Sequence, residues 1–331
     1  MTAAGRLRVA VVGAGVMGRH HANNYLAMPR AELVAVVDPD PLARANAERS
    51  FGCAAYPDVA AMLRATRPQA ASVAAPTSHH FSATERLLDA GVHVLVEKPV
   101  AATIAEARRL AQRSRAAGLV LQVGHITRFF RAVQLLAERV EEPYLIEARR
   151  LSPQARIKDV GVILDLMIHD IDIVLGMVPS AIADVSVAGH VVDDGSPYED
   201  VAAAQLTFEN GCIARFLASR VAPDAERSLV VAERERTFRV DFLREPHTEI
   251  AVYQARRDEA GDTHVRTDRH VVAEDNPLRE QLEHFLDRIA TAVPPIGTLD
   301  DDLRSLQVAT ELLGRLRPAE APRAALTPRV H

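Results

Sequence analysis

The sequence has no tryptophan, and only 4% of its 331 residues are aromatic. Proteins that hold single-stranded nucleic acid stack its bases on aromatic side chains, so the composition argues against that class. The net charge of −5 likewise gives no electrostatic reason to bind nucleic acid or an anionic membrane. No uninterrupted apolar run approaches the roughly 18 residues of a membrane-spanning helix. The chain therefore has the make-up of an ordinary globular protein that is long enough for two domains.

Cysteine is also scarce. Cys53 and Cys212 lie far apart and form no metal or redox motif, so we expect no metal ion and interpret both as small core residues in a reducing cytosol. The segment 1–15 enters an apolar strand without the long apolar core and cleavage site of a signal peptide. We therefore expect a cytoplasmic protein.

The segment Arg8–Asp38 is the most informative part of the chain. An apolar strand leads into Gly13–Gly18, with the sequence GAGVMG, and a helical stretch and a second apolar strand follow. This is the context of the dinucleotide-binding fingerprint. Gly13 permits the tight turn, Gly15 lets the backbone approach a pyrophosphate, and Gly18 lets the helix pack on the strand. The motif predicts cofactor contacts at Gly13, Gly15, Val16, Met17 and Gly18.

Asp38 ends the second strand and indicates which dinucleotide binds. A carboxylate at this position accepts hydrogen bonds from the adenosine ribose and repels a 2′-phosphate. Asp38 therefore favours NAD over NADP. Arg44 lies six residues later and could in principle face a phosphate, but we interpret it as a residue of a solvated helix face.

Strands and helices alternate through the first third of the chain. We expect strands at Arg8–Val12, Glu32–Val37, Ala71–Ala74, His93–Val96 and Val120–Val123. We expect helices at Val16–Met28, Pro41–Arg49, Asp58–Thr66, Phe81–Ala90 and Ile104–Ala117. The alternation predicts an α/β fold, a doubly wound parallel sheet that forms a Rossmann domain over residues 1–123.

The pattern changes after this domain. The expected elements are a helix at Phe130–Arg139, a strand at Tyr144–Leu151, a helix at Val160–Leu175, successive β-type runs over Ala181–Arg269 and a helical region at Pro277–Arg317. Asn210-Gly211 between two runs is typical of a two-residue hairpin turn. We expect an α+β domain over residues 124–317 with a large, mostly antiparallel open sheet, followed by a tail at 318–331. One sheet face would pack on the 160–175 helix, and the other would need a partner, which predicts a homodimer or homotetramer.

Two loops follow strands of the first domain at their carboxyl ends, where ligands bind in open parallel sheets. The first, Pro76–His80, should border the dinucleotide, unless Thr77 or Ser78 only caps a helix and the histidines are exposed. The second, Glu97–Pro99, carries a lysine whose pKa can fall beside a positively charged nicotinamide, so that it could bind or deprotonate a substrate hydroxyl. The alternative is a solvated lysine. The predicted cofactor contacts are Pro76, Thr77, His80, Glu97 and Lys98.

A strongly apolar helix carries Asp165, His169 and Asp172 at i, i+4 and i+7, which places them on one face. Polar groups on a buried helix need partners. One carboxylate can fix the imidazole tautomer and leave the other ring nitrogen as a base. The alternative is a buried structural network closed by arginines. Asp170 falls off this face and is expected to cap or pair locally.

Four segments, GAGVMG, APTSHH, VEKPVAAT and DLMIHDID, occur in this order. With them, residues 6–315 resemble the glucose–fructose oxidoreductase and inositol 2-dehydrogenase family (Gfo/Idh/MocA). The resemblance implies hydride transfer between a sugar-like alcohol and NAD(P). It implies a catalytic lysine at Lys98, an Asp-x-x-x-His pair at Asp165 and His169, and a loop histidine at His80.

Three details refine this resemblance. The match at His80 makes its neighbour His79 incidental. The family often has a glycine pair before the catalytic helix, where this chain has Gly161-Val162. The stretches VGHITRFFRAV and DVGVILDLMIHDIDIVL are similar to the UDP-N-acetylglucosamine 3-dehydrogenase branch of the family, whose GHxxRF motif falls on 124–129.

This branch resemblance implies a nucleotide-sugar site. Arg128 would suit a diphosphate, because a guanidinium forks onto phosphate oxygens. Arg156 and Lys158, just ahead of the catalytic helix, could also neutralise a diphosphate or could form a solvated basic loop. The predicted substrate contacts are His125, Arg128, Arg156, Lys158 and Asp172.

The predicted reaction is NAD-dependent oxidation of the 3-hydroxyl of UDP-N-acetylglucosamine to a ketone, for amino-sugar, lipid A or surface-polysaccharide synthesis. His169 or Lys98 would take the hydroxyl proton, and Asp165 would orient the pair. One alternative is a free sugar or inositol dehydrogenase of the same family. Another is a catalytically silent NAD-binding sensor or scaffold, although such a protein need not keep these three residues.

Overall fold

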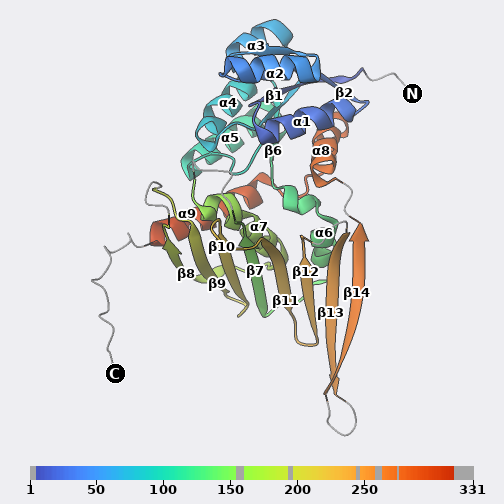
Figure 1. Ribbon diagram of the computed structural model, residues 1–331, viewed down its shortest axis with the longest axis vertical. Helices are drawn as coiled ribbons and strands as arrows, with labels where there is room; N and C mark the ends of the chain where they lie inside the picture. The colour runs from blue at the N-terminus through green and yellow to red at the C-terminus, as the bar shows by residue number, and fades with distance from the viewer. Residues whose placement is uncertain are drawn as a thin grey trace.

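A computed structural model describes residues 5–153, 160–192, 197–243, 247–257, 263–273 and 276–316. Figure 1 shows two domains. In the smaller one, helices cover both faces of a parallel sheet, and the larger one is built on a wide open sheet. No helix within these ranges is long and apolar enough to cross a membrane.

The N-terminal sheet is parallel throughout, with strand order β3-β2-β1-β4-β5-β6. Its strands are β1 (Leu7–Val12), β2 (Ala31–Val37), β3 (Ala54–Tyr56), β4 (Ala70–Val73), β5 (His93–Val96) and β6 (Leu121–Val123). Its helices are α1 (Val16–Ala27), α2 (Pro41–Phe51), α3 (Val59–Thr66), α4 (Thr77–Asp89) and α5 (Ile104–Ala117). The predicted doubly wound Rossmann fold is confirmed. The edge strand β3 was not predicted, because three residues are too few to show a period.

The predicted extent of the loop at Pro76–His80 is wrong, because most of this segment is helical. Pro76 is the N-cap of α4, and the helix begins at Thr77 rather than at Phe81. Pro76 has an extended backbone with a ψ of 147° and lies just outside the helix, which begins four residues earlier than the apolar pattern indicates. The residues of PTSHH therefore form the first turn of α4 at the carboxyl edge of the sheet.

The C-terminal sheet has the strand order β14-β13-β12-β11-β7-β10-β9-β8. Its strands are β7 (Leu145–Leu151), β8 (Ile182–His190), β9 (Val201–Phe208), β10 (Ile213–Ser219), β11 (Glu226–Ala232), β12 (Arg236–Asp241), β13 (His247–Arg257) and β14 (Thr263–Ala273). The pairings are antiparallel except for β7 with β10. Gly211 has a φ of +85° in the turn between β9 and β10. The predicted antiparallel sheet and its hairpin are confirmed.

Helices cover one face of this sheet. They are α6 (Arg131–Arg139), α7 (Ile168–Met177) and α9 (Leu299–Arg315), which lie between the sheet and the N-terminal domain (Figure 1). The buried cysteine Cys212 belongs to this core, whereas Cys53 is half-buried at the margin of the N-terminal core. The opposite sheet face carries exposed ion pairs, such as Arg215 with Glu147 at 3.3 Å.

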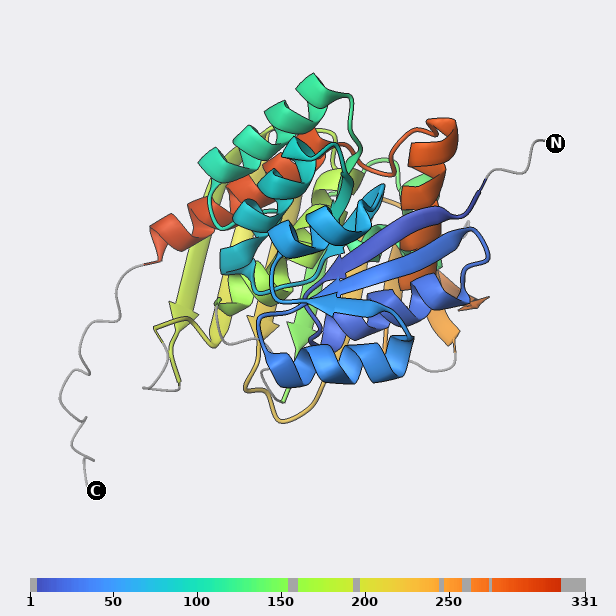
Figure 2. The ribbon, with the colours of Figure 1, turned by 90° about the horizontal axis from the view of Figure 1, so that it is seen from above.

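The last helical region consists of two helices that pack in different places. The helix α8 (Pro277–Thr291) returns to the N-terminal domain, where Phe285 and Leu282 share a core cluster with Tyr25 of α1. The helix α9 instead runs beside α5 (Figure 2). The predicted boundary at residue 123 therefore separates the sheets but not all of the packing, because α8 completes the core of the first domain.

Candidate functional site

The glycine turn leaves room for a dinucleotide. Gly13 has a φ of +98°, and a Cβ there would lie 2.5 Å from the carbonyl oxygen of Ala74. A Cβ on Gly18 would lie 1.8 Å from the carbonyl oxygen of Gly13, so both positions require glycine. A Cβ on Gly15 would meet nothing within 4 Å. Gly15 is the N-cap of α1 and provides no side-chain cap, so the first N–H groups of this helix can bind a pyrophosphate.

The carboxylate of Asp38 is held beside this turn. One oxygen accepts a 2.8 Å hydrogen bond from the N–H of Ala14, and the other accepts a 2.9 Å bond from the N–H of Asp40. Arg44 uses Nη1 to bind the carbonyl oxygens of Asp38 and Pro39 at 2.9 Å and 2.8 Å. The guanidinium of Arg44 therefore binds the backbone, and the charged group beside the glycine turn is the Asp38 carboxylate. Val16 and Met17 are exposed beside it, so this part of the chain fits NAD.

His80 holds two loops together. It is buried, with Nδ1 2.7 Å from the carbonyl oxygen of Pro99 and Nε2 2.8 Å from that of Ala75. The prediction that His80 contacts the cofactor is therefore not supported, because both ring nitrogens face the protein backbone. The side chain instead fixes the loop after β5, which carries Lys98, to the loop after β4.

Glu97 pairs with a residue that sequence reasoning missed. Its Oε1 lies 3.0 Å from Nε2 of His21, a buried residue of α1. Burial raises the pKa of Glu97, but the hydrogen bond and charge of His21, with the charges of Lys98 and His80, lower it below its ordinary value overall. No periodicity could identify this pair, since 76 positions separate the two residues.

Lys98 contacts the helical region that carries Asp165 and His169. Its Nζ donates to the carbonyl oxygen of Asp165 at 2.6 Å and to the Oδ1 of the same residue at 3.1 Å. Both side chains are 11% exposed. Asp165 lies in a π-helical turn, Ile163–Met167, which leads into α7. Such turns are rare and occur often at functional sites. The sequence predicted a regular α-helix over 160–175 and did not indicate this turn. The alternative of a solvated lysine is excluded.

His169 follows one turn later and is kept uncharged by its surroundings. Burial lowers its pKa well below the ordinary value, and the positive charges of Lys98 and Arg150 lower it further. Its Nδ1 is buried and has no hydrogen-bond partner among the described residues. A neutral imidazole beside Lys98 can accept a proton from a substrate hydroxyl. Its neighbour Asp170 pairs with Arg150 of β7, as expected for a residue off this face.

Glu199 was also missed, and it positions the start of the π-helical turn. Its Oε1 accepts a 2.9 Å hydrogen bond from the N–H of Ile163. A Cβ on Gly161 would lie 2.0 Å from the Glu199 carboxylate, so a side chain there would displace this carboxylate from its present position. Val162 is fully buried in the core. The departure from the glycine pair of the family is therefore accommodated, because only the first position contacts the carboxylate.

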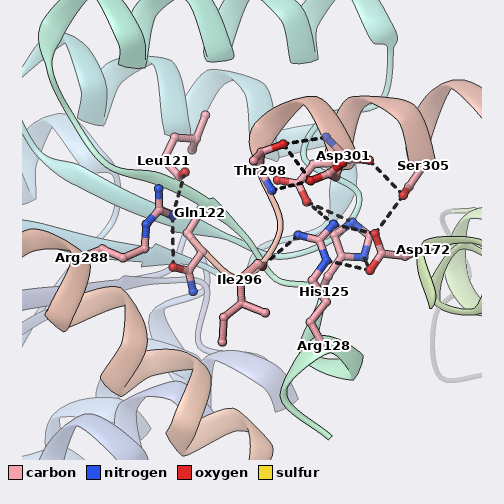
Figure 3. Close-up of polar contacts among 11 residues, drawn as sticks. Leu121, Gln122, His125, Arg128, Asp172, Arg288, Ile296, Thr298, Asp301 and Ser305 are labelled. Carbon is pink, nitrogen blue, oxygen red and sulfur yellow. Dashed lines mark hydrogen bonds and ion pairs between the residues drawn. The ribbon is translucent and has the colours of Figure 1, made fainter. Parts of the chain in front are cut away.

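The residues predicted to bind substrate at the domain junction form an internal network instead (Figure 3). Nε and Nη2 of Arg128 donate to the two oxygens of Asp172 at 2.8 Å and 2.6 Å, and Nη2 also lies 2.8 Å from Asp302 of α9. Ser305 donates to Asp172 at 2.9 Å. The Arg128 side chain is 13% exposed. Its fork is occupied by carboxylates, so the predictions that Arg128 and Asp172 bind substrate are corrected.

The charge states of this junction network follow from burial. Burial lowers the pKa of His125 to about 4, although the nearby Asp172 opposes the shift. Burial also raises the pKa of Asp302 to about 7, against the opposing charge of Arg128. His125, Asp172 and Asp302 place possible ligand atoms within 4.8 Å of one another. Arg128 already supplies the cation between the two carboxylates, and His125 is enclosed with them rather than turned to a substrate.

The two aspartates spaced along the helix, Asp165 and Asp172, therefore belong to different clusters. Asp165 belongs with Lys98, whereas Asp172 belongs to the structural network closed by an arginine. The other two predicted substrate contacts, Arg156 and Lys158, lie outside the described residues.

Comparison with known proteins identifies both domains. Residues 7–125 match a model described as an oxidoreductase family with an NAD-binding Rossmann fold, and residues 137–240 match the GFO/IDH/MocA C-terminal domain. The chain is 34% identical to UDP-N-acetylglucosamine 3-dehydrogenase of Acidithiobacillus ferrooxidans, over 87% of this chain and 90% of that protein. It is 27% identical to scyllo-inositol 2-dehydrogenase (NAD(+)) of Bacillus subtilis, over 74% and 77% of the two chains.

Solved structures agree with this family assignment. A structure of the Acidithiobacillus ferrooxidans enzyme superposes with a TM-score of 0.84 at 32% identity, covering 94% of this chain and 98% of that chain. The NAD complex of GenD2 from gentamicin A biosynthesis shares the fold, with a TM-score of 0.81 at 22% identity over 95% of both chains.

Proposed function

Because the chain belongs to the GFO/IDH/MocA family of oxidoreductases and carries its NAD-binding Rossmann domain, we propose that it oxidises the 3-hydroxyl of a UDP-N-acetylglucosamine-like sugar nucleotide to a ketone. The contact between Lys98 and Asp165 beside a neutral His169 carries the proposal that the site is catalytic. The similarity to a UDP-N-acetylglucosamine 3-dehydrogenase supports the substrate class.

In the proposed reaction, the glycine turn and the start of α1 would hold NAD, which would supply the hydride acceptor for C3 of the sugar. His169 accepts the hydroxyl proton, since its ring is neutral at physiological pH. Nζ of Lys98 donates a hydrogen bond to the same oxygen and stabilises the negative charge that develops there. Asp165 orients Lys98 through its carbonyl and carboxylate oxygens. His80 and Glu199 hold the two backbone segments that carry these groups.

A substrate panel tests this proposal. UDP-N-acetylglucosamine, other UDP-sugars, the corresponding free sugars and inositols are incubated with NAD or NADP, and reduction of the cofactor is followed by absorbance. We expect turnover with UDP-N-acetylglucosamine and a product lighter by two hydrogens in mass spectrometry. Preferential oxidation of a free sugar or an inositol would support the alternative substrate class. No turnover with any member would favour a silent NAD-binding protein.

A binding titration tests cofactor preference. The Asp38 carboxylate lies beside the glycine turn, where a 2′-phosphate would place negative charge against it. We therefore expect NAD to bind more tightly than NADP when each is titrated into the ligand-free protein. Tighter binding of NADP would contradict this role of Asp38.

We also propose that the protein is a homodimer or homotetramer through the C-terminal sheet. Helices cover one face of this eight-stranded sheet, and side chains of the opposite face, including Arg215, Arg239 and Glu147, point outward. Light scattering at micromolar concentration should give at least twice the monomer mass of 36.1 kDa. A monomer under these conditions would contradict the proposal.

A further inference from the structure

His21 is a polar residue on the buried face of the helix that begins at the glycine turn. The buried residues of α1 are Gly18, His21, Ala22 and Tyr25, at i, i+3, i+4 and i+7. The His21 side chain is 0% exposed, and its Nδ1 has no hydrogen-bond partner among the described residues. A buried imidazole is costly unless it is hydrogen-bonded. The contact between its Nε2 and Glu97 is therefore the polar interaction that holds this ring in the core.

The Glu97 carboxylate is enclosed between α1 and the end of β6. Its Oε1 lies 3.0 Å from Nε2 of His21. On the other side, a Cβ on Gly124 would lie 2.9 Å from Oε2 of Glu97 and 3.0 Å from its Cα. The lowered pKa of Glu97 keeps the carboxylate ionised, so it accepts the hydrogen bond and Nε2 of His21 carries the proton. The position of Glu97 is thus fixed by contacts from two elements of the first domain.

Glu97 is the residue directly before Lys98, and a second buried histidine holds the residue directly after it. Nδ1 of His80 in α4 lies 2.7 Å from the carbonyl oxygen of Pro99. The residues on both sides of Lys98 are therefore held by buried imidazoles from two different helices. Between these two contacts, Nζ of Lys98 reaches the carbonyl oxygen and Oδ1 of Asp165 at 2.6 Å and 3.1 Å.

We propose that His21 is a positioning residue for the proposed oxidation and that it acts through Lys98. By fixing the Glu97 carboxylate, it holds the next residue so that Nζ of Lys98 lies beside the reacting hydroxyl. The helix α1 also begins at the N–H groups that would bind the pyrophosphate of NAD, so the same helix fixes the lysine relative to the cofactor. This inference rests on the proposed function, because it gives His21 no role unless Lys98 takes part in the reaction.

Three substitutions at His21 test this inference with UDP-N-acetylglucosamine, or with whichever member of the substrate panel is oxidised. His21→Leu removes the donor, and His21→Asn places its amide nitrogen near the position of Nδ1, which is too far from Glu97 to donate to it. His21→Gln places its amide nitrogen near the position of Nε2 and keeps the donor. We expect the first two variants to lower kcat by about 10- to 100-fold, as for a displaced reacting group, with KM and the Kd for NAD unchanged. His21→Gln should stay within about threefold of the wild type.

A double-mutant cycle separates positioning from a merely structural role. In the Lys98→Ala background, His21→Leu should lower kcat by less than about twofold, because the group through which it acts is already absent. Tyr25→Phe is the matched control. It removes another buried hydrogen bond of α1, the 2.7 Å contact with Ser72, which does not involve the segment that carries Lys98. We expect this control to keep wild-type kcat, and urea unfolding measures the stability loss of each variant.

The outcomes separate this inference from the proposed function. If His21→Leu and His21→Asn keep wild-type kcat while Lys98→Ala loses it, the inference fails and the proposed function stands. An equal loss of kcat in Tyr25→Phe, or an additive loss in the Lys98→Ala background, would also overturn the inference. If His21→Leu does not fold, the comparison of His21→Asn with His21→Gln decides, and equal rates for the two contradict the inference. If Lys98→Ala retains turnover, or if the wild type oxidises no member of the panel, the catalytic role of Lys98 fails and this inference fails with it.

Discussion

We expect Lys98→Ala to lower kcat by about 10²–10⁴-fold, the usual contribution of a group that assists proton transfer. Nζ of Lys98 is held by Asp165 and adds to the charges that keep His169 neutral, so its removal changes both members of the proposed pair. The lysine lies after β5, whereas the pyrophosphate site lies at the start of α1. The Kd for NAD should therefore stay at its wild-type value. Cofactor titration and single-turnover kinetics separate the two effects.

His79→Ala is the matched control for this variant. His79 also follows a strand of the parallel sheet at its carboxyl end, but it is exposed on α4. We expect it to keep wild-type kcat and KM. Lys98→Arg retains a positive charge but changes the shape and donor geometry of the group, and we expect it to remain impaired. If Lys98→Ala retained turnover within about threefold of wild type, Lys98 would have no role in the chemical step.

We expect Arg128→Met to reduce the free energy of unfolding by about 3–5 kcal/mol, as is typical when one partner of a buried ion pair is removed. The substitution leaves Asp172 and Asp302 facing each other with their side chains 3% and 5% exposed. The substitution also removes the 3.4 Å hydrogen bond from Nη1 of Arg128 to the carbonyl oxygen of Ile296. Urea unfolding measures the change. Arg131→Met, at a side chain that is 51% exposed, should change stability by less than about 0.5 kcal/mol.

The loss in Arg128→Met should depend on pH. Burial opposes ionisation of Asp172, but His125 and Arg128 lower its pKa overall, so the wild-type pairing stabilises the fold above the ordinary range of an aspartate. Without Arg128, ionised Asp172 and Asp302 repel each other, and protonation relieves this repulsion as the pH falls. The difference from wild type should therefore be larger at pH 8 than at pH 6. A difference that did not exceed that of Arg131→Met at either pH would contradict a stabilising role for the network.

The sequence alone determined the features that depend on local rules. Gly13 and Gly18 were predicted because a left-handed turn and a close helix–strand approach tolerate no side chain, and the structure has both. The alternation of apolar runs predicted both sheets, since burial of a strand imposes a period on its own residues. The position of Lys98 after a parallel strand placed it at the ligand-binding edge, because all strands of such a sheet end there.

Only the tertiary structure decided which charged groups meet. Asp165 and Asp172 share one helical region, yet the first binds Lys98 and the second binds Arg128. These contacts join residues 67 and 44 positions apart. A periodic pattern states which face of a helix is buried, but it carries no information about which charge lies opposite. The sequence therefore could not show that Arg128 binds carboxylates rather than a diphosphate, because a guanidinium that suits phosphate suits a buried carboxylate equally well.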